Sequence, residues 1–268
     1  MKRRAFLSTG LALGVAPVLG MSEITKESTQ SETGSNVQYF EWIRYQLHVG
    51  SKQNIVADYY RDVAILALNK AGINNVGIFN VKHGINSPTL HVIIPHPSLE
   101  SIVTTNDKLL EDNNYVQAGK RFLEPPMSDT AFVKMEKSIM RAFTNLPEIQ
   151  LPLQKKSNKP RIFQVRVYES PSIIAAKKKI HMFNEGGEIA IFKRAGLQPV
   201  LFGEVIAGDK MPCLVYILAF DDMNDLAEKW SVFAKDPAWE VLRKDSYYAD
   251  TVSCINDWIW SPASGSQI

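Results

Sequence analysis

The chain repeats itself at a constant spacing. Moved along by 124 positions, residues 65–120 fall on residues 189–244 without a gap. Asp112 then coincides with Asp236. Because insertions in loops usually destroy such a spacing, the constant offset predicts two copies of one structural unit.

The second copy shows the elements of this unit most clearly. Residues 163–168 alternate between apolar and polar side chains, which is the period of a β-strand with two different faces. Ser170-Pro171 opens a helical stretch as cap and first-turn proline, and Gly196 closes it. The remaining pattern predicts strands at 199–205, 213–220 and 252–260, a turn at 208–210, a helix at 223–233 capped by Asp222, and a short helix from Asp236-Pro237. The order βαββαβ is that of a ferredoxin-like unit.

The first copy follows the same order. Its pattern predicts strands at 38–47, 76–82, 89–94 and 137–143, a first helix at 51–70 and a hairpin at 83–88. Residues 150–160 contain two prolines and three lysines, which is typical of a linker. We therefore expect an α+β protein with one unit at 37–149 and a second at 161–268.

A four-stranded antiparallel sheet with both helices on one side leaves its other face bare. Two such units bury these faces by pressing them together, and a tandem chain can close the resulting barrel within itself. The sequence therefore predicts an intrachain α/β barrel. If the apolar side chains of 163–168 pack on helices, Gln164, Arg166 and Tyr168 face the barrel interior.

The N-terminus has the features of an export signal. Residues 1–20 combine a basic start with a short, mildly apolar run and small residues near its end. Arg3 and Arg4, followed by Phe6 and Leu7, resemble the twin-arginine motif. We expect 1–20 to be a signal peptide and 21–36 a flexible tether. The protein is then exported, periplasmic or envelope-associated, with no transmembrane span in the mature chain.

Charge and motifs exclude several classes of function. The net charge of +2 becomes −1 without the three basic residues among the first four positions. The pI of 8.4 is thus no sign of the clustered basic face that nucleic acid requires, and we expect no nucleic-acid partner. Cys213 and Cys254 have no zinc spacing, and no nucleotide, hydrolase or metal motif is present, so we predict no cofactor and no metal.

With both halves laid out, residues 37–268 resemble the NIPSNAP family of the dimeric α/β-barrel superfamily. The motifs that carry this resemblance are Phe163-Gln164-Val165-Arg166-Val167-Tyr168, Met182-Phe183-Asn184-Glu185-Gly186, Leu197-Gln198-Pro199-Val200-Leu201-Phe202-Gly203-Glu204, Asp236-Pro237-Ala238-Trp239, Ser266-Gln267-Ile268, Asn86-Ser87-Pro88-Thr89-Leu90 and Ile94-Pro95-His96-Pro97-Ser98-Leu99-Glu100-Ser101. The likeness is greatest to exported bacterial members with two tandem copies and a twin-arginine signal.

The resemblance implies no settled activity. Animal members resemble mitochondrial scaffold and interaction proteins, whereas the wider superfamily includes cofactor-free oxygenases and haem-binding enzymes. The chain also departs from the family pattern. Ile43 stands where Arg is usual, Gln164 stands where Glu is usual, and Ser261 stands where an Arg usually precedes proline. These departures weaken an enzymatic interpretation borrowed from relatives.

The candidate ligand-binding residues are polar side chains that we expect inside the barrel. They are Glu41, Tyr45, His91, Gln164, Arg166, Tyr168 and Tyr216. His91 lies opposite Leu90 and Val92 on its strand, and a histidine there is either a base, a haem ligand or a hydrogen-bonded interior residue. The tyrosines and Arg166 either orient a small polar or aromatic ligand or seal the interface between the halves.

Two functions remain open. The first is a non-catalytic ligand-binding or protein-interaction module whose partner is an unknown small molecule or protein, with self-association into a homo-oligomer left open. The alternative is a cofactor-free oxygenase or isomerase that acts on a small hydrophobic or aromatic substrate inside the barrel. The enzyme requires a cavity of roughly 300 Å³ or more with convergent polar groups, whereas a scaffold is expected to fill its barrel with side chains.

Overall fold

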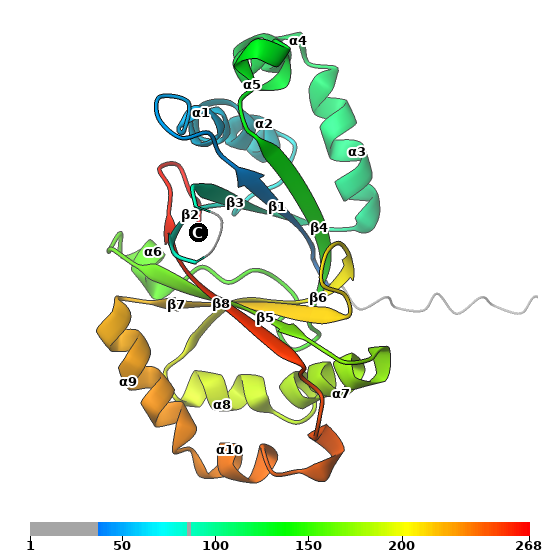
Figure 1. The fold of residues 1–268 in the computed structure, drawn as a ribbon, viewed down its shortest axis with the longest axis vertical. Coiled ribbons are helices and arrows are strands. Elements are labelled where there is room, and N and C mark those ends of the chain that lie inside the picture. The colour runs from blue at the N-terminus through cyan, green and yellow to red at the C-terminus, as the bar shows by residue number, and fades with distance from the viewer. Residues whose placement is uncertain (1–36, 85–86) are drawn as a thin grey trace, which may run out of the picture. The chain divides into compact units, whose positions relative to one another are not determined.

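The computed structural model describes residues 37–84 and 87–268 (Figure 1). The signal peptide predicted at 1–20, the tether predicted at 21–36 and two residues of the first predicted hairpin, 85–86, lie outside the described residues.

The first unit contains four strands and two groups of helices. Its elements are β1 (Tyr39–Gln46), α1 (Ile55–Tyr59), a π-helical turn η1 (Tyr60–Ala64), α2 (Ile65–Lys70), β2 (Gly77–His83), β3 (Thr89–His96), α3 (Leu99–Leu110), α4 (Asn113–Ala118), α5 (Lys120–Leu123), a 3₁₀ turn η2 (Met127–Asp129) and β4 (Lys134–Ala142). The segment that follows contains the short helix α6 (Leu153–Lys156).

The second unit repeats this plan. Its elements are β5 (Ile162–Glu169), α7 (Ile173–Asn184), α8 (Glu188–Arg194), β6 (Gln198–Ala207), β7 (Cys213–Phe220), α9 (Met223–Ala234), α10 (Pro237–Leu242), a 3₁₀ turn η3 (Ser246–Tyr248) and β8 (Cys254–Pro262). The predicted tandem of two ferredoxin-like units is therefore confirmed.

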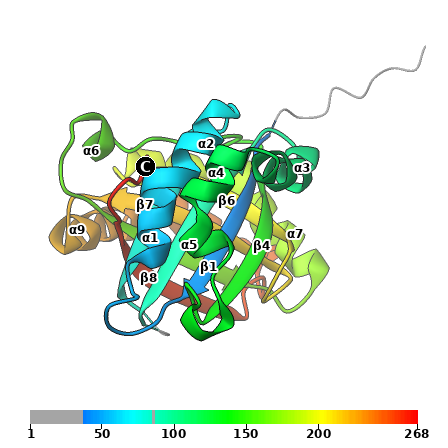
Figure 2. The same ribbon diagram turned by 90° about the horizontal axis from the view of Figure 1, so that it is seen from above.

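The two sheets close into one barrel. Its strands follow the order β1-β3-β2-β8-β5-β7-β6-β4, and β4 returns to β1. Within each unit the sheet has the order of a split βαβ fold, and antiparallel β2–β8 and β4–β6 pairs join the units. The helices of the first unit lie on one side of the strands and those of the second unit on the other (Figure 1), and Figure 2 shows α1, α2, α4 and α5 covering the first sheet. The predicted intrachain barrel is confirmed.

Closure divides the apolar residues into three cores. One lies inside the barrel and brings together Phe40 and Phe79 of the first unit with Phe163 of the second. The second lies between the first sheet and its helices, and the third lies between the second sheet and its helices. Each sheet is therefore packed on both of its faces.

Strand β5 presents to the barrel the face that we did not expect. Phe163 and Val167 belong to the barrel core, whereas Tyr168 belongs to the core under the helices. Because side chains alternate along a strand, Gln164 and Arg166 share the helix side with Tyr168. The predicted barrel-interior placement is thus wrong for these three polar residues. An eight-stranded barrel has an interior just wide enough for side chains to fill, and apolar residues fill it here.

The same correction applies to three residues on other strands. Tyr45 packs under the helices of the first unit and Tyr216 under those of the second. Side chains at every second position of a strand share a face, and Glu41 therefore lies on the same side of β1 as Tyr45, four positions further on. Only His91 of the seven candidates lies on the barrel side, where it stacks on the barrel-core residue Trp260.

The helix boundaries follow local chemistry. The helical stretch predicted at 171–194 is broken after α7, because Gly187 adopts a left-handed backbone conformation (φ +85°) that other residues rarely adopt. Ser172, rather than the predicted Ser170, caps α7 by accepting a hydrogen bond from the Ala175 N–H at 3.1 Å. Asp222 caps α9 as predicted, and the recurring Asp112 and Asp236 cap α4 and α10, a role that their recurrence in the repeat indicates.

Trp260 tests how much the barrel core contributes to stability. It is fully buried on β8, where that strand pairs with β2 of the other unit, and its ring centroid lies 5.3 Å from that of Phe79. We expect Trp260→Ala to lower the free energy of unfolding by about 3–5 kcal/mol. Urea unfolding measures this, with Ile255→Ala on the exposed part of β8 as control. A loss of under about 1 kcal/mol, as surface sites give, would contradict it.

Candidate functional site

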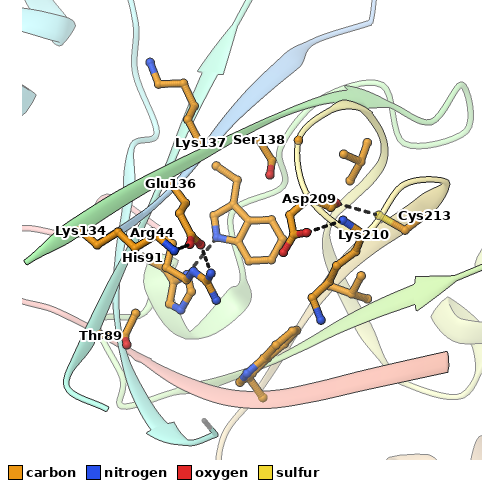
Figure 3. A pocket seen from close by; sticks show the side chains of 15 residues that line it. Arg44, Thr89, His91, Lys134, Glu136, Lys137, Ser138, Asp209, Lys210 and Cys213 are labelled. Carbon is orange, nitrogen blue, oxygen red and sulfur yellow. Dashed lines mark hydrogen bonds and ion pairs between the residues drawn. The ribbon is translucent and has the colours of Figure 1, made fainter. Parts of the chain in front are cut away.

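A pocket of about 590 Å³ lies at one end of the barrel interior (Figure 3). The first unit forms one wall with the end of β1 and the starts of β3 and β4, and the second unit forms the other with the β6–β7 turn and β7. Figure 3 shows Arg44, Lys134, Glu136 and His91 on one side of the pocket and Asp209 and Lys210 on the other. The residues that line it also include Trp42, Val167, Cys213 and Trp258.

Strand alternation aims these side chains into the barrel. Phe40 belongs to the barrel core, so Trp42 and Arg44, at the following alternate positions of β1, face the same way. Met140 fixes the facing of β4, which places Glu136 and Lys134 at the mouth of the barrel. The barrel core fills the interior beyond this pocket.

The wall of the first unit is charged. Arg44 and Lys134 both form ion pairs with the Glu136 carboxylate, and the Arg44 and Glu136 side chains are 29% and 30% exposed. Two cations thus share one anion, which leaves a net positive charge at this wall. Such a wall favours an anionic group on a ligand.

The opposite wall contributes two charged side chains from the β6–β7 turn. The Lys210 ammonium lies 3.4 Å from a Glu169 carboxylate oxygen and donates a hydrogen bond to the Asn256 side-chain oxygen at 3.1 Å. The Asp209 carboxylate accepts a hydrogen bond from the Lys210 backbone N–H at 2.9 Å. Both walls therefore offer polar groups to a molecule held between them.

His91 is fixed in its neutral form. Its Nδ1 accepts a hydrogen bond from the Trp42 indole N–H at 3.0 Å, and its ring stacks on Trp260 with centroids 4.2 Å apart. Burial, together with the Arg44 charge, lowers the pKa of His91 to about 3. Because the indole only donates, Nδ1 has no proton, and the single proton of the ring resides on Nε2. His91 is thus a hydrogen-bonded interior histidine, the more conservative of the roles considered for it.

Cys213 is also held in an unreactive form. Burial, together with the carboxylates of Glu169 and Asp209, raises the pKa of the Cys213 thiol to about 12. A thiol is a nucleophile only as the thiolate, so Cys213 acts here as a small apolar wall. Both Cys213 and Cys254 are free thiols.

Four predicted site residues come together elsewhere, under the helices of the second unit. Arg166 donates a hydrogen bond to the Tyr216 hydroxyl at 3.1 Å, and the hydroxyls of Tyr216 and Tyr168 lie 2.9 Å apart. The Gln164 amide donates to Asp257 at 2.7 Å, and this carboxylate lies 3.3 Å from the Arg166 Nε. Burial raises the pKa of Asp257 despite Arg166. These groups bind one another across β5, β7 and β8, on the face of the second sheet that its helices cover.

The remaining two predicted residues lie under the helices of the first unit. The Tyr45 hydroxyl lies 2.9 Å from that of Tyr60, and the Glu41 carboxylate accepts a hydrogen bond from Lys137 at 2.5 Å. A cavity of about 320 Å³ opens beside them. Sequence reasoning therefore named residues from three separate places, divided from one another by the sheet.

Sequence reasoning missed most residues of the barrel pocket. Trp42 and Arg44 are absent from the predicted site because the residues of β1 expected inside the barrel were Glu41 and Tyr45, which lie on the opposite face of the strand. Asp209 and Lys210 were recognised only as turn residues, although a charged turn at a barrel end is a signal in itself. In the described part of the chain, no group of three or more His, Cys, Asp or Glu side chains is placed to hold a metal ion, and no helix there is long and apolar enough to cross a membrane.

Solved structures with a similar fold have very different sequences. A "putative monooxygenase" from Fusobacterium nucleatum subsp. nucleatum ATCC 25586 is 8% identical, with a TM-score of 0.55, and the match covers 85% of this chain and 93% of that one. A protein of the same description from Lactobacillus acidophilus NCFM is 9% identical, with a TM-score of 0.54, over 86% of this chain and 97% of that one. At such identities the likeness shows the fold alone.

The sequence itself gives the family. A NIPSNAP family protein with unknown function from Agrobacterium tumefaciens str. C58 is 25% identical over 38% of this chain and 88% of its own, with a TM-score of 0.33. Comparison with curated proteins gives no match. The sequence model of the NIPSNAP family matches residues 40–147 and again residues 163–267, so that both units are recognised. The chain belongs to the NIPSNAP family.

Proposed function

We propose that this protein is a non-catalytic binding module that holds a small molecule in the barrel pocket. The observation that carries this proposal is the combination of a cavity of about 590 Å³ with charged and aromatic side chains that converge on it. The volume lies within the range of small-molecule sites, about 300–1,000 Å³. If the barrel served only to join the two units, we would expect side chains to fill this space.

The lining indicates the class of ligand. Arg44 and Lys134 supply the positive wall and suit a carboxylate or another anionic head group. The rings of Trp42 and Trp258, whose centroids lie 6.5 Å apart in an edge-to-face arrangement, offer apolar surface to the rest of the molecule. We therefore expect a small organic anion with an aromatic or other apolar body.

The groups available for catalysis favour binding over chemistry. A general base works best when its pKa lies near the operating pH. His91 titrates far below neutral pH and Cys213 far above it. The alternative, a cofactor-free oxygenase or isomerase, draws support from the monooxygenase-like fold but requires a reactive group other than His91 or Cys213.

The first prediction is that a small molecule co-purifies with the protein. We expect native mass spectrometry of the protein, purified from the cells that produce it, to show one bound small molecule per chain, which denaturation releases for identification. A protein that is empty, and binds only another protein, would refute the ligand proposal in favour of an interaction module. Turnover of the released compound by the purified protein would favour the enzymatic alternative.

Arg44 is expected to determine the affinity for this compound. A hydrogen bond to a charged group contributes about 1.5–3 kcal/mol, so Arg44→Leu is expected to weaken binding by at least about tenfold. Titration calorimetry with the co-purified compound measures the change. Arg141→Leu is the matched control, since Arg141 also pairs with a glutamate on a neighbouring strand, Glu204, but lies outside the pocket. Equal affinities of the two variants would place the ligand elsewhere.

We also propose that the chain is exported through the twin-arginine route, on the strength of Arg3, Arg4, Phe6 and Leu7. Twin-arginine export carries folded proteins, which suits a ligand pocket assembled before transport. Arg3→Lys combined with Arg4→Lys is expected to keep the protein in the cytoplasm, as cell fractionation and immunoblotting would show. Export of this double variant at the level of the unaltered chain would rule the route out.

A further inference from the structure

The repeat lets one half of the molecule serve as a reference for the other. The strand registers match, because Glu41 pairs with Ile94 in the first unit as Gln164 pairs with Leu218 in the second. The helix α3 (99–110) corresponds to α9 (223–234) at the constant offset of 124 residues. Differences between the two helix–sheet layers are therefore differences between equivalent positions.

In the second unit an indole ring fills this layer. Trp230 of α9 donates its ring N–H to the Gln164 side-chain oxygen at 2.6 Å. Its ring packs edge to face on Phe192 and Phe233, with centroids 5.5 and 5.3 Å away. The Arg166 guanidinium lies 5.2 Å from the centre of the same ring. The Trp230 indole is thus enclosed by aromatic rings, and its N–H is bound by the Gln164 side-chain oxygen.

In the first unit the equivalent positions hold smaller side chains. Asn106 replaces Trp230, Leu109 replaces Phe233, Leu68 replaces Phe192 and Ile43 replaces Arg166. All four of these smaller residues line the cavity of about 320 Å³. The cavity therefore exists because the side chains that fill the second unit are absent from the first.

An acceptor stands at the end of this cavity. Glu41 takes the place of Gln164, and its side chain is only 8% exposed. Its carboxylate accepts a hydrogen bond from Lys137 at 2.5 Å and lies 3.5 Å from the buried His96 ring. Although burial alone would raise it, these contacts with His96 and Lys137 lower the pKa of Glu41, so the group is an ionised carboxylate at neutral pH.

The tyrosine hydroxyls that line the cavity are paired with one another. The hydroxyls of Tyr45 and Tyr60 bond each other, as do those of Tyr59 and Tyr115. The ring of Phe122 stacks on Tyr59 with centroids 3.9 Å apart. Because the tyrosines already have partners, the Glu41 carboxylate is the buried anionic acceptor that the cavity offers to a ligand. Its charge is balanced by Lys137, so a neutral N–H donor fits better than a second cation.

We propose that the cavity of the first unit binds a neutral aromatic heterocycle with a ring N–H, of the indole or benzimidazole class, in the place that the Trp230 ring occupies in the second unit. The ring N–H donates to the Glu41 carboxylate, and the ring plane packs among the aromatic side chains under α3 and α5. This site lies on the other side of the sheet from the barrel pocket and does not depend on the function proposed for that pocket.

The first test compares two probes that differ in a single hydrogen-bond donor. In titration calorimetry with the full-length protein, indole is expected to bind one site per chain. The probe 1-methylindole, which has the same ring system but no N–H, is expected to bind at least about tenfold more weakly, since it leaves the buried Glu41 acceptor unpaired. Absence of indole binding, or equal affinity for the two probes, would overturn the proposal.

The second test fills the cavity with the larger side chains that the second unit has at the equivalent positions. Asn106→Trp is expected to abolish indole binding, because the new ring takes the position of the ligand. Leu109→Phe, which copies Phe233, is a second filling variant in case the first folds poorly. The matched control is Val103→Trp, which adds the same ring to α3 at a position that is 69% exposed.

Thermal unfolding and circular dichroism check that each variant folds. Undiminished indole binding to folded Asn106→Trp and Leu109→Phe would contradict the proposed site. Arg44→Leu, which alters only the barrel pocket, should leave indole affinity unchanged, and so the two sites can fail independently. A tenfold loss of indole affinity in that variant would place the indole in the barrel and overturn the proposal.

Discussion

The pairing of β2 with β8 and of β4 with β6 closes the sheet, and that closure decides which side of the sheet the polar side chains of the strands occupy. A closed barrel has no free edge, and each of its two sheets packs on the barrel interior with one face and on helices with the other. Its interior is packed with apolar side chains from both units, and charged residues reach inward at the end marked by the β6–β7 turn. The barrel pocket is thus the place where a packed interior meets solvent.

Closure also explains which parts of the structure could be predicted from the sequence. The constant repeat and the alternation of residues such as Phe163 and Gln164 are local signals, and they predicted the order of the elements and the tandem fold. The aspartate caps were predictable for the same reason, since a cap bonds to backbone groups two or three residues away.

The facing of the strands was not predictable in this way. Alternation distinguishes two faces of β5 but does not say which one turns to the barrel, because both are buried against something. Gln164 and Arg166 lie under the helices since Trp230 and Asp257, far away in the sequence, meet them there. No pattern within one strand carries that information, and a wrong facing moves every candidate residue of that strand to the wrong side of the sheet.

The two units differ clearly in their helix–sheet layers. The first pairs Glu41 on β1 with Lys137 on β4, whereas the second pairs Arg166 on β5 with Asp257 on β8, so the signs of the charges are reversed between the equivalent strand pairs. The second layer also contains a buried ion pair between Lys179 and Glu188 at 2.8 Å. Its polar groups are paired with one another and its space is filled by aromatic rings.

The first layer differs in its backbone as well. The π-helical turn at Tyr60–Ala64 widens the helix locally, and the neighbouring Tyr59 and Tyr60 both point into the layer. Such turns are frequent at functional sites, and here one turn sets two aromatic side chains beside the cavity next to Glu41. Both units are needed to close the barrel, but the helix–sheet layers take no part in that closure, and so one layer is free to exchange packing for an open site. The filled second layer and the hollow first layer are what that division of roles would produce.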